Sequence, residues 1–130
     1  NCNLRAIPPQ TNKVFVTLYS AKSACYDLAL GVLLQSFRLT NSSHKFIVLY
    51  APSITLEPDL LRIGGSAVEF VPVPLLKDLV VDPRLETMAT KFQLWRLICY
   101  DAVAYYDADH IFLENVDDVF DECGASDFCA

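Results

Sequence analysis

Three short runs in this sequence carry apolar side chains on both faces of an extended chain. The runs are Val14–Tyr19, Lys45–Ala51 and Val68–Pro72. A strand that is apolar on both faces is buried on both sides, which is typical of a parallel sheet covered by helices. Between the first two runs, apolar residues from Ala24 to Leu39 recur at helical spacing, and Ser23 is the predicted N-cap. The alternation predicts an α/β, Rossmann-like fold whose mostly parallel sheet has helices on both faces.

The rest of the chain is less regular but continues the alternation. Met88, Phe92, Trp95 and Cys99 follow one another at steps of four, three and four, which predicts a helix with Trp95 in the core. Two further predictions are a short helix capped by Thr55 and ended by Gly64-Gly65, and an irregular loop over Pro74–Arg84. Beyond these, the pattern predicts a fourth strand over Ala102–Tyr106, a fifth short strand at Ile111–Leu113 and a helix from Val116 to Phe120. Ligands of such sheets bind beyond the carboxyl ends of the strands, so the segments after the first and fourth strands are the candidate site.

Acidic residues outnumber basic ones by 16 to 10, which gives a formal net charge of −6. This balance repels a polyanion and argues against a nucleic-acid partner. With few basic groups available, a divalent cation held by carboxylates is the natural bridge to a nucleotide diphosphate. The longest apolar run, Leu28–Leu34, is far shorter than the roughly 20 residues that a membrane span requires, so no span is expected.

The five cysteines contain no CxxC pair, which argues against a structural zinc site. Cys2, Cys123 and Cys129 lie near the ends of the chain and could pair in an oxidising compartment. Asn41–Ser43 is an N-glycosylation sequon in a predicted surface loop. These features favour a Golgi or secretory lumen over the cytoplasm without deciding the compartment.

Two aspartates, Asp107 and Asp109, directly follow the fourth predicted strand. Side chains at positions i and i+2 of an extended backbone point the same way, so both carboxylates can face one cation. Their oxygens suit Mg²⁺ or Mn²⁺, which neutralises the charge that builds on a leaving diphosphate. The small Ala108 between them allows close approach of a sugar nucleotide. By the same alternation His110 points away from Asp109, which argues against His110 as a further ligand.

Other protein classes also place D-x-D after a strand. A bare D-x-D is compatible with a solvated turn, so the surrounding pattern has to decide. In phosphatases of the haloacid-dehalogenase type the motif opens the domain, whereas here only 21 residues (110–130) follow Asp109. A Rossmann dehydrogenase needs a glycine-rich turn after its first strand, and Tyr19–Tyr26 contains no glycine.

The sequence resembles the glycogenin-like family 8 glycosyltransferases over nearly all of residues 13–121. That family has a T-K-hydrophobic-x-x-W helix, a strand that ends in D-A-D and an N-[IV]-D-x-[LV]-F segment, in this order. The matching segments here are Thr90–Leu97, Tyr100–Asp101, Val103–Asp109 and Asn115–Asp121. Phe15–Leu18 and the predicted helix over Tyr26–Phe37 are similar to the family's uridine-binding first strand and helix.

The resemblance implies a GT-A-type enzyme that transfers a hexosyl or pentosyl unit from a UDP-sugar to a carbohydrate or protein acceptor, with Mn²⁺ or Mg²⁺ as cofactor. It assigns backbone contacts with the base and ribose to Leu18 and Ser20, and stacking on the uracil to Tyr26. Lys91 matches the lysine that reaches the donor phosphates or sugar. Arg84 corresponds to an upstream basic residue of the family, although the spacing differs.

The same resemblance makes Asp107 and Asp109 the metal ligands and Ala108 the backbone contact between them. The family's third metal ligand is a histidine in a C-terminal H-x-x-G-x-x-K-P motif, which this sequence does not contain. Neither His44 nor His110 matches that histidine. No catalytic base or nucleophile can therefore be named.

These departures define the expected domain organisation. We expect a tail over residues 1–12, a UDP-sugar-binding domain over 13–121 and the start of a missing C-terminal portion over 122–130, so that the fold is incomplete at the C-terminus. The alternative to an enzyme is a non-catalytic UDP-sugar-binding fragment or interaction module that lacks the acceptor half. Turnover of UDP-glucose separates the two, because a module shows none.

Overall fold

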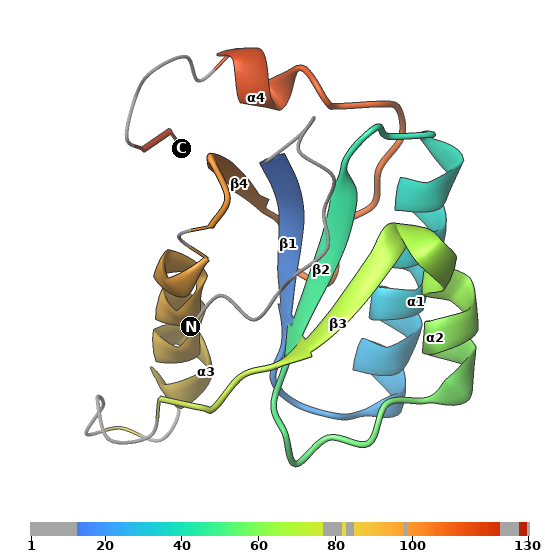
Figure 1. Cartoon of the computed structure of the whole chain (residues 1–130). Helices are drawn as coiled ribbons and strands as arrows, with labels where there is room; N and C mark the ends of the chain where they lie inside the picture. The colour runs from blue at the N-terminus through green and yellow to red at the C-terminus, as the bar shows by residue number, and fades with distance from the viewer. Residues whose placement is uncertain (1–12, 77–81, 83–84, 98, 123–127, 130) are drawn as a thin grey trace.

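The computed structural model describes residues 13–76, 82, 85–97, 99–122 and 128–129. Its centre is a four-stranded sheet of β1 (Lys13–Tyr19), β2 (Lys45–Tyr50), β3 (Val68–Pro72) and β4 (Ala102–Tyr105). The strand order is β3-β2-β1-β4, and each neighbouring pair runs parallel (Figure 1). The predicted α/β, Rossmann-like architecture is confirmed, and the sheet is consistent with a GT-A-type fold.

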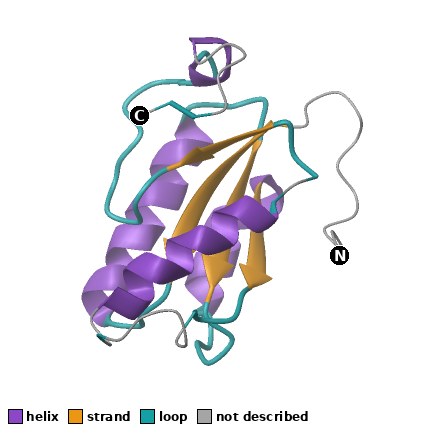
Figure 2. Cartoon of the chain, turned by 90° about the vertical axis from the view of Figure 1, so that its left-hand side faces the viewer, coloured by secondary structure: helices purple, strands orange, loops and turns teal. Residues whose placement is uncertain are grey.

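Helices cover both faces of the sheet, as the sequence predicts. The helices α1 (Ala24–Leu39) and α2 (Pro58–Gly64) pack on one face, whereas α3 (Glu86–Thr90) and the 3₁₀ helix η4 (Lys91–Arg96) pack on the other (Figures 1 and 2). Two smaller elements complete the fold, the 3₁₀ turn η1 (Gly65–Ala67) before β3 and the short helix α4 (Val119–Glu122) after β4. The predicted domain bounds at residues 13 and 121 stay a prediction.

Side chains alternate along β1 between two hydrophobic cores, one on each face of the sheet. On the α1 side, the rings of Phe15, Phe37 and Phe46 pack with centroids 4.9 to 6.5 Å apart. On the opposite side, Val14 and Val16 belong to the second core. Because β1 is buried on both faces, the loop that follows its carboxyl end starts from a rigid anchor.

The helix α1 begins where the sequence predicts, and its N-cap is confirmed. The backbone of Ser23 is extended, and the Ser23 Oγ accepts a hydrogen bond from the backbone N–H of Tyr26 at 3.2 Å. The cap fixes the first turn of α1 directly after β1. As a result the Tyr26 side chain lies close to the carboxyl end of that strand.

The start of α2 differs from the prediction, because Thr55 does not cap it. The helix begins at Pro58, and Glu57 is the residue before it. Proline at the first helical position has no N–H to satisfy and its φ is already helical, so the helix can start without a hydroxyl cap. The end of α2 is as predicted, with Gly65 at φ 57°.

The segment that follows residue 85 departs most from the prediction. It is not one long helix, because α3 ends at Thr90 and η4 continues as a 3₁₀ helix. Met88, Phe92 and Trp95 are all more than 60% exposed. The prediction that Trp95 lies in the core is therefore wrong.

Polar side chains explain why the other side of this segment faces the sheet. Thr90 and Gln93 are both buried. The hydroxyl of Thr90 accepts a hydrogen bond from the backbone N–H of Leu76 at 3.2 Å, and the amide of Gln93 donates to the carbonyl of Pro74 at 2.7 Å. Residues 73–76 after β3 have no regular secondary structure, as predicted for the start of the Pro74–Arg84 loop, most of which lies outside the described residues. Backbone groups there have no strand partner, and these two polar side chains supply partners for them.

The predicted fifth strand at Ile111–Leu113 does not form, because this segment is a loop. Its middle residue, Phe112, is buried in the α1-side core, and its backbone N–H donates to the buried Ser36 hydroxyl at 3.0 Å. Ile111 and Leu113 point outward. One anchored aromatic therefore fixes this segment in place of a strand ladder, and α4 follows close to the predicted helix start.

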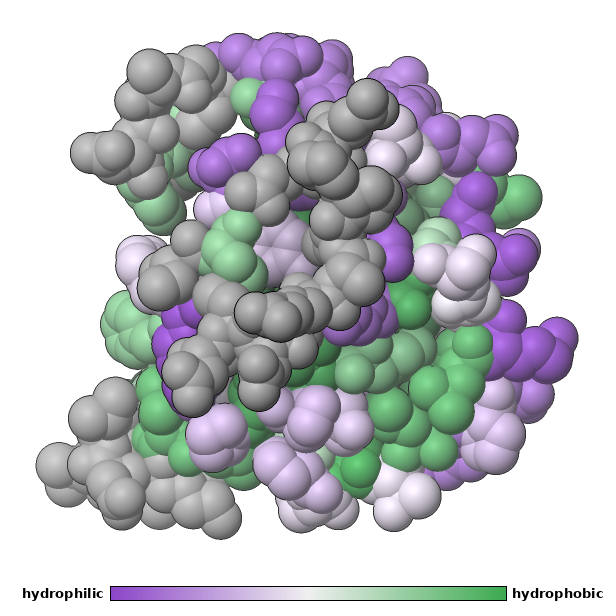
Figure 3. Space-filling model, viewed as in Figure 1, coloured by the Kyte–Doolittle hydropathy of each residue, from purple (hydrophilic) through white to green (hydrophobic). Residues whose placement is uncertain are grey.

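The surface of the described part is mixed in character. Figure 3 shows hydrophilic side chains along the upper rim and right-hand edge of this face and hydrophobic ones in its lower part. None of the described helices combines the length and apolar character needed to cross a bilayer. Asn41 is exposed just after α1, which confirms the surface loop predicted for the sequon. Cys129 is disulfide-bonded, while Cys2 and Cys123 lie outside the described residues.

Candidate functional site

A cavity of about 270 Å³ opens beyond the carboxyl ends of β1 and β4. This is the edge at which parallel α/β sheets bind ligands. The cavity is lined by Leu18, Tyr19, Ser20, Ala21, Tyr26, Met88, Lys91, Tyr105, Asp107, Ala108 and Asp109. Residues from four separate parts of the chain therefore meet at one place.

The structure brings together seven of the eight predicted site residues, since every one except Arg84 lines this cavity. Arg84 lies outside the described residues. Leu18 and Ala108 are buried, so they can offer mainly backbone groups to a ligand. The ring of Tyr26 is 51% exposed in the first turn of α1, so one of its faces is accessible.

Asp107 is held by two donors that share one of its oxygens. Lys91 Nζ donates to Asp107 Oδ1 at 2.7 Å, and the Tyr105 hydroxyl donates to the same oxygen at 2.8 Å. The Lys91 ammonium also lies 5.1 Å from the centre of the Tyr105 ring, a cation–π contact. The three side chains form a cluster that we call the Lys91 cluster.

Electrostatics in the Lys91 cluster follow from these contacts. The hydrogen bond from Lys91 holds the pKa of Asp107 below its ordinary value, so the carboxylate is ionised at neutral pH. Burial, and then the hydrogen bond to Asp107, raises the pKa of Tyr105 and keeps its hydroxyl protonated. Asp107 is therefore a charged side chain with one oxygen, Oδ1, already engaged by protein donors.

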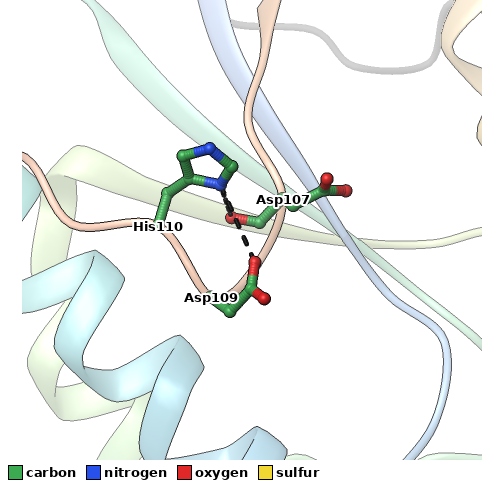
Figure 4. Close-up of side chains that lie close together, drawn as sticks. All are labelled: Asp107, Asp109 and His110. Carbon is green, nitrogen blue, oxygen red and sulfur yellow. Dashed lines mark hydrogen bonds and ion pairs between the residues drawn. The ribbon is translucent and has the colours of Figure 1, made fainter.

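Asp107, Asp109 and His110 lie close together on the turn after β4, where His110 faces Asp109 and the Asp107 carbonyl while the Asp107 carboxylate points away from the ring (Figure 4). One carboxylate oxygen of each aspartate and a ring nitrogen of the histidine lie within 4.8 Å of one another. His110 Nδ1 is 3.7 Å from Asp109 Oδ1 and 3.1 Å from the Asp107 carbonyl oxygen. The prediction that His110 points away from Asp109 is wrong, because β4 ends at Tyr105 and strand alternation stops there.

The donor set of this turn fits a divalent cation. Two ligand atoms on opposite sides of an ion with bonds of about 2.1 Å lie about 4.2 Å apart. The three candidate ligand atoms lie within 4.8 Å of one another, which is close to that separation. Carboxylate oxygens suit Mg²⁺ and Mn²⁺, and the exposed Asp109 leaves room for water and ligand oxygens.

Four residues that line the cavity were not predicted as site residues from the sequence: Tyr19, Ala21, Met88 and Tyr105. Tyr105 stands two positions before Asp107, so strand alternation, applied backwards from Asp107, would have placed its hydroxyl on the same side. Tyr19 lines the cavity and its hydroxyl donates to Asp27, in the first turn of α1. No sequence signal marks that second contact, because it depends on how α1 packs against β1.

The parallel sheet, with a cavity at its carboxyl edge, is consistent with a GT-A-type fold. No protein-family model matches the chain. The chain is 34% identical to human "Glycogenin-2" over 85% of its own length and 23% of that protein, and 32% identical to human "Glycogenin-1" over 85% and 33%. It is 31% identical to "Inositol phosphorylceramide glucuronosyltransferase 1" of Arabidopsis thaliana over 79% of this chain and 19% of that protein.

These similarities cover most of the chain and agree with the motifs of its sequence. The chain belongs to the glycogenin-like family 8 glycosyltransferases. It spans about a fifth to a third of the length of the curated relatives it matches.

Proposed function

We propose that this chain forms the donor- and metal-binding part of an enzyme that transfers a hexosyl or pentosyl unit from a UDP-sugar to a carbohydrate or protein acceptor. The observation that supports this most is the cavity at the carboxyl edge of the sheet. It gathers an accessible aromatic ring, a lysine and two converging carboxylates around one space. A nucleotide diphosphate presents a flat base and two phosphates, which these groups complement.

Each residue has a proposed part in holding the donor. The backbone at Leu18 and Ser20 contacts the base and ribose, and the exposed ring of Tyr26 stacks on the uracil. Lys91 donates its ammonium protons to diphosphate oxygens. Ala108 lets the nucleotide sugar approach the backbone closely, because its side chain is one methyl group.

Asp107 and Asp109 are the proposed ligands of Mn²⁺ or Mg²⁺. When bound, the ion supplies Lewis-acid stabilisation of the charge on the departing diphosphate. The two aspartates position the diphosphate by fixing that charge at the sheet's edge. His110 lies within reach as a third donor, which makes it a candidate ligand that the sequence argument had set aside.

Calorimetry of UDP binding with and without Mn²⁺ tests this proposal. We expect binding that depends on the metal in the wild type and falls by at least about tenfold in Asp109→Asn, since loss of even an outer-shell partner of a metal typically costs 10- to 100-fold. The Asp109 side chain is 78% exposed, so the variant should keep its stability within about 0.5 kcal/mol.

Asp118→Asn is the matched control, because it removes the same charge from an exposed position outside the cavity. It should leave UDP binding unchanged. UDP binding that is equally strong without metal would show that the aspartate pair has no role in donor binding. Release of UDP from UDP-glucose by the protein then distinguishes an enzyme from a non-catalytic UDP-sugar-binding module.

A further inference from the structure

The Lys91 cluster contains a conflict that the proposed function does not resolve. Asp107 is a proposed metal ligand, yet its Oδ1 already accepts hydrogen bonds from Lys91 at 2.7 Å and from Tyr105 at 2.8 Å. A ligating carboxylate oxygen must direct a lone pair at the ion. Two donors occupy Oδ1, which leaves Oδ2 as the oxygen of Asp107 without a hydrogen-bond donor among the described residues.

The two donors differ in what a cation does to them. The Tyr105 hydroxyl is neutral, so it can stay beside a metal-bound carboxylate. Lys91 carries a full positive charge, and two cations that share one carboxylate group repel each other at short range. A divalent ion at either oxygen of Asp107 therefore binds more weakly while the ammonium stays on Oδ1, and more tightly once the ammonium moves away.

Lys91 is able to make this move. Its side chain is 38% exposed and lines the cavity, so it can swing towards the solvent side without breaking the core. Its other contact is with the ring face of Tyr105 at 5.1 Å, which tolerates a range of positions. The other carboxylate that lines the cavity, Asp109, is itself a proposed metal ligand, whereas a diphosphate supplies the displaced ammonium with a new anionic partner.

We propose that Lys91 is an internal competitor of the metal, which occupies Asp107 until a nucleotide diphosphate draws it away. The inference rests on the proposed function, because it takes Asp107 as the metal ligand and a diphosphate as the ligand. It adds a coupling between the two sites: metal binding is weakened by Lys91 when nucleotide is absent and is favoured when nucleotide is present. Reciprocity then requires the metal to favour nucleotide binding by the same factor.

Removal of the charge on Lys91 should have different effects on Mn²⁺ affinity in the absence and in the presence of nucleotide. In Lys91→Met, we expect Mn²⁺ to bind about three- to fivefold more tightly without nucleotide, the effect of removing a partly exposed ion pair. With saturating UDP the gain should disappear or reverse, because the diphosphate has lost a cationic partner. A lysine that only stabilises the fold would lower metal binding in both conditions or leave it unchanged.

The measurement is the free Mn²⁺ signal in electron paramagnetic resonance, titrated with and without UDP. Lys22→Met is the matched control, since Lys22 pairs with Glu57 outside the cavity and its removal changes the net charge equally. We expect that control to shift Mn²⁺ affinity by less than about twofold, as for other exposed pairs. Circular dichroism of each variant establishes that it is folded.

The outcomes separate the two proposals. If the wild type shows metal-dependent UDP binding while Lys91→Met binds Mn²⁺ no more tightly than the wild type without nucleotide, the competition is disproved and the proposed function stands. If the folded wild type binds neither Mn²⁺ nor UDP, both are overturned. A gain in Mn²⁺ affinity in Lys22→Met as large as in Lys91→Met would also overturn the competition, because net charge alone would explain it.

Discussion

Two acidic segments lie only a few residues apart in this chain, but the carboxylates of one line a cavity whereas a carboxylate of the other holds two parts of the fold together. The turn over Asp107–Asp109 leaves its carboxylates at the rim of a cavity, where one is held by a lysine and the other is exposed. In the segment over Asn115–Asp121, the Asp117 carboxylate is bound by protein donors. It accepts hydrogen bonds from the Ser42 hydroxyl and from the backbone N–H and hydroxyl of Ser43, which connects the loop between α1 and β2 to the segment after β4.

The difference shows what decides whether an aspartate can bind a ligand. Both oxygens of Asp117 are used by protein donors, so a metal would have to replace several hydrogen bonds at once. Asp107 gives both its contacts to one oxygen, and Asp109 has only His110 beside it among the described residues. Both segments contain carboxylates, and they differ in how many carboxylate oxygens have no protein donor and are free to bind a metal.

The largest expected effect tests whether the second segment is structural. Phe120 is buried against Phe15 and His44, with ring centroids 4.9 Å apart in both pairs. Phe120→Ala should lower the free energy of unfolding by about 3 kcal/mol through lost burial and a cavity. Chemical denaturation measures this, with the exposed Leu113→Ala as the control that should change little.

The same variant should leave the Mn²⁺ affinity of the folded protein within about twofold, because Phe120 lies in the α1-side core and not at the cavity. A loss of metal binding in folded Phe120→Ala would break the comparison. It would mean that the two acidic segments act as one unit.

A smaller effect is expected from Asp117→Asn. The substitution keeps the shape of the side chain but removes its charge and one acceptor, which should cost about 1–2 kcal/mol of stability. Asp118→Asn, next along the chain and exposed, should stay within about 0.5 kcal/mol of the wild type. If both variants are equally stable in a urea titration, the Asp117 contacts contribute nothing and the segment is not held by its carboxylate.

The smallest effect concerns how each carboxylate is kept charged. The pKa of Asp107 is lowered chiefly by the hydrogen bond from Lys91, a full charge. For Asp117, burial acts to raise the pKa, but hydrogen bonds from Ser42 and Ser43 outweigh it and lower the pKa overall. Each group therefore adds stability above its unfolded pKa of about 3.9, and the stability is lost as pH falls through the lower folded pKa.

A change in salt concentration distinguishes the effect of the charged Lys91 on Asp107 from the effect of the neutral serine groups on Asp117. Because the Debye length shrinks to about 3 Å at about 1 M salt, screening should raise the pKa of Asp107 towards its ordinary value. The pKa of Asp117 should move less, since its hydrogen-bond partners are neutral hydroxyl and amide groups and the charge interaction with His44 contributes less than they do. Carboxyl ¹³C shifts in nuclear magnetic resonance, followed against pH at low and high salt, measure both. An equal response of the two aspartates would contradict the distinction.

Much of the fold could be predicted because local patterns and tertiary demands agree there. The apolar residues on both faces of Val14–Tyr19 require a doubly covered strand, and Ser23 satisfies N–H groups that every helix start leaves free. The Asp107–Asp109 pair was also visible, since its residue types and its place after a strand are both local facts. Its role as a ligand site stays a proposal.

The errors arise where contacts between segments decide the structure and the local pattern does not. The spacing of Met88, Phe92 and Trp95 marks a helical stripe, but spacing does not say whether the stripe or the opposite side meets the sheet. Backbone groups after β3 needed partners, so Thr90 and Gln93 face inward and Trp95 faces outward. His110 was misplaced because the end of β4 depends on pairing with β1.

The sequence by itself determined the four strands of the sheet, where α1 starts and which carboxylates could serve a cation, because each depends on neighbours along the chain. Only the tertiary structure decided which side of the α3–η4 segment is buried and that Lys91 and Tyr105 share one oxygen of Asp107. Those outcomes depend on contacts between segments far apart or on the exact end of a strand. The spacing of residues along the chain does not decide these outcomes, because they depend on which apolar and polar side chains find partners on other segments of the fold.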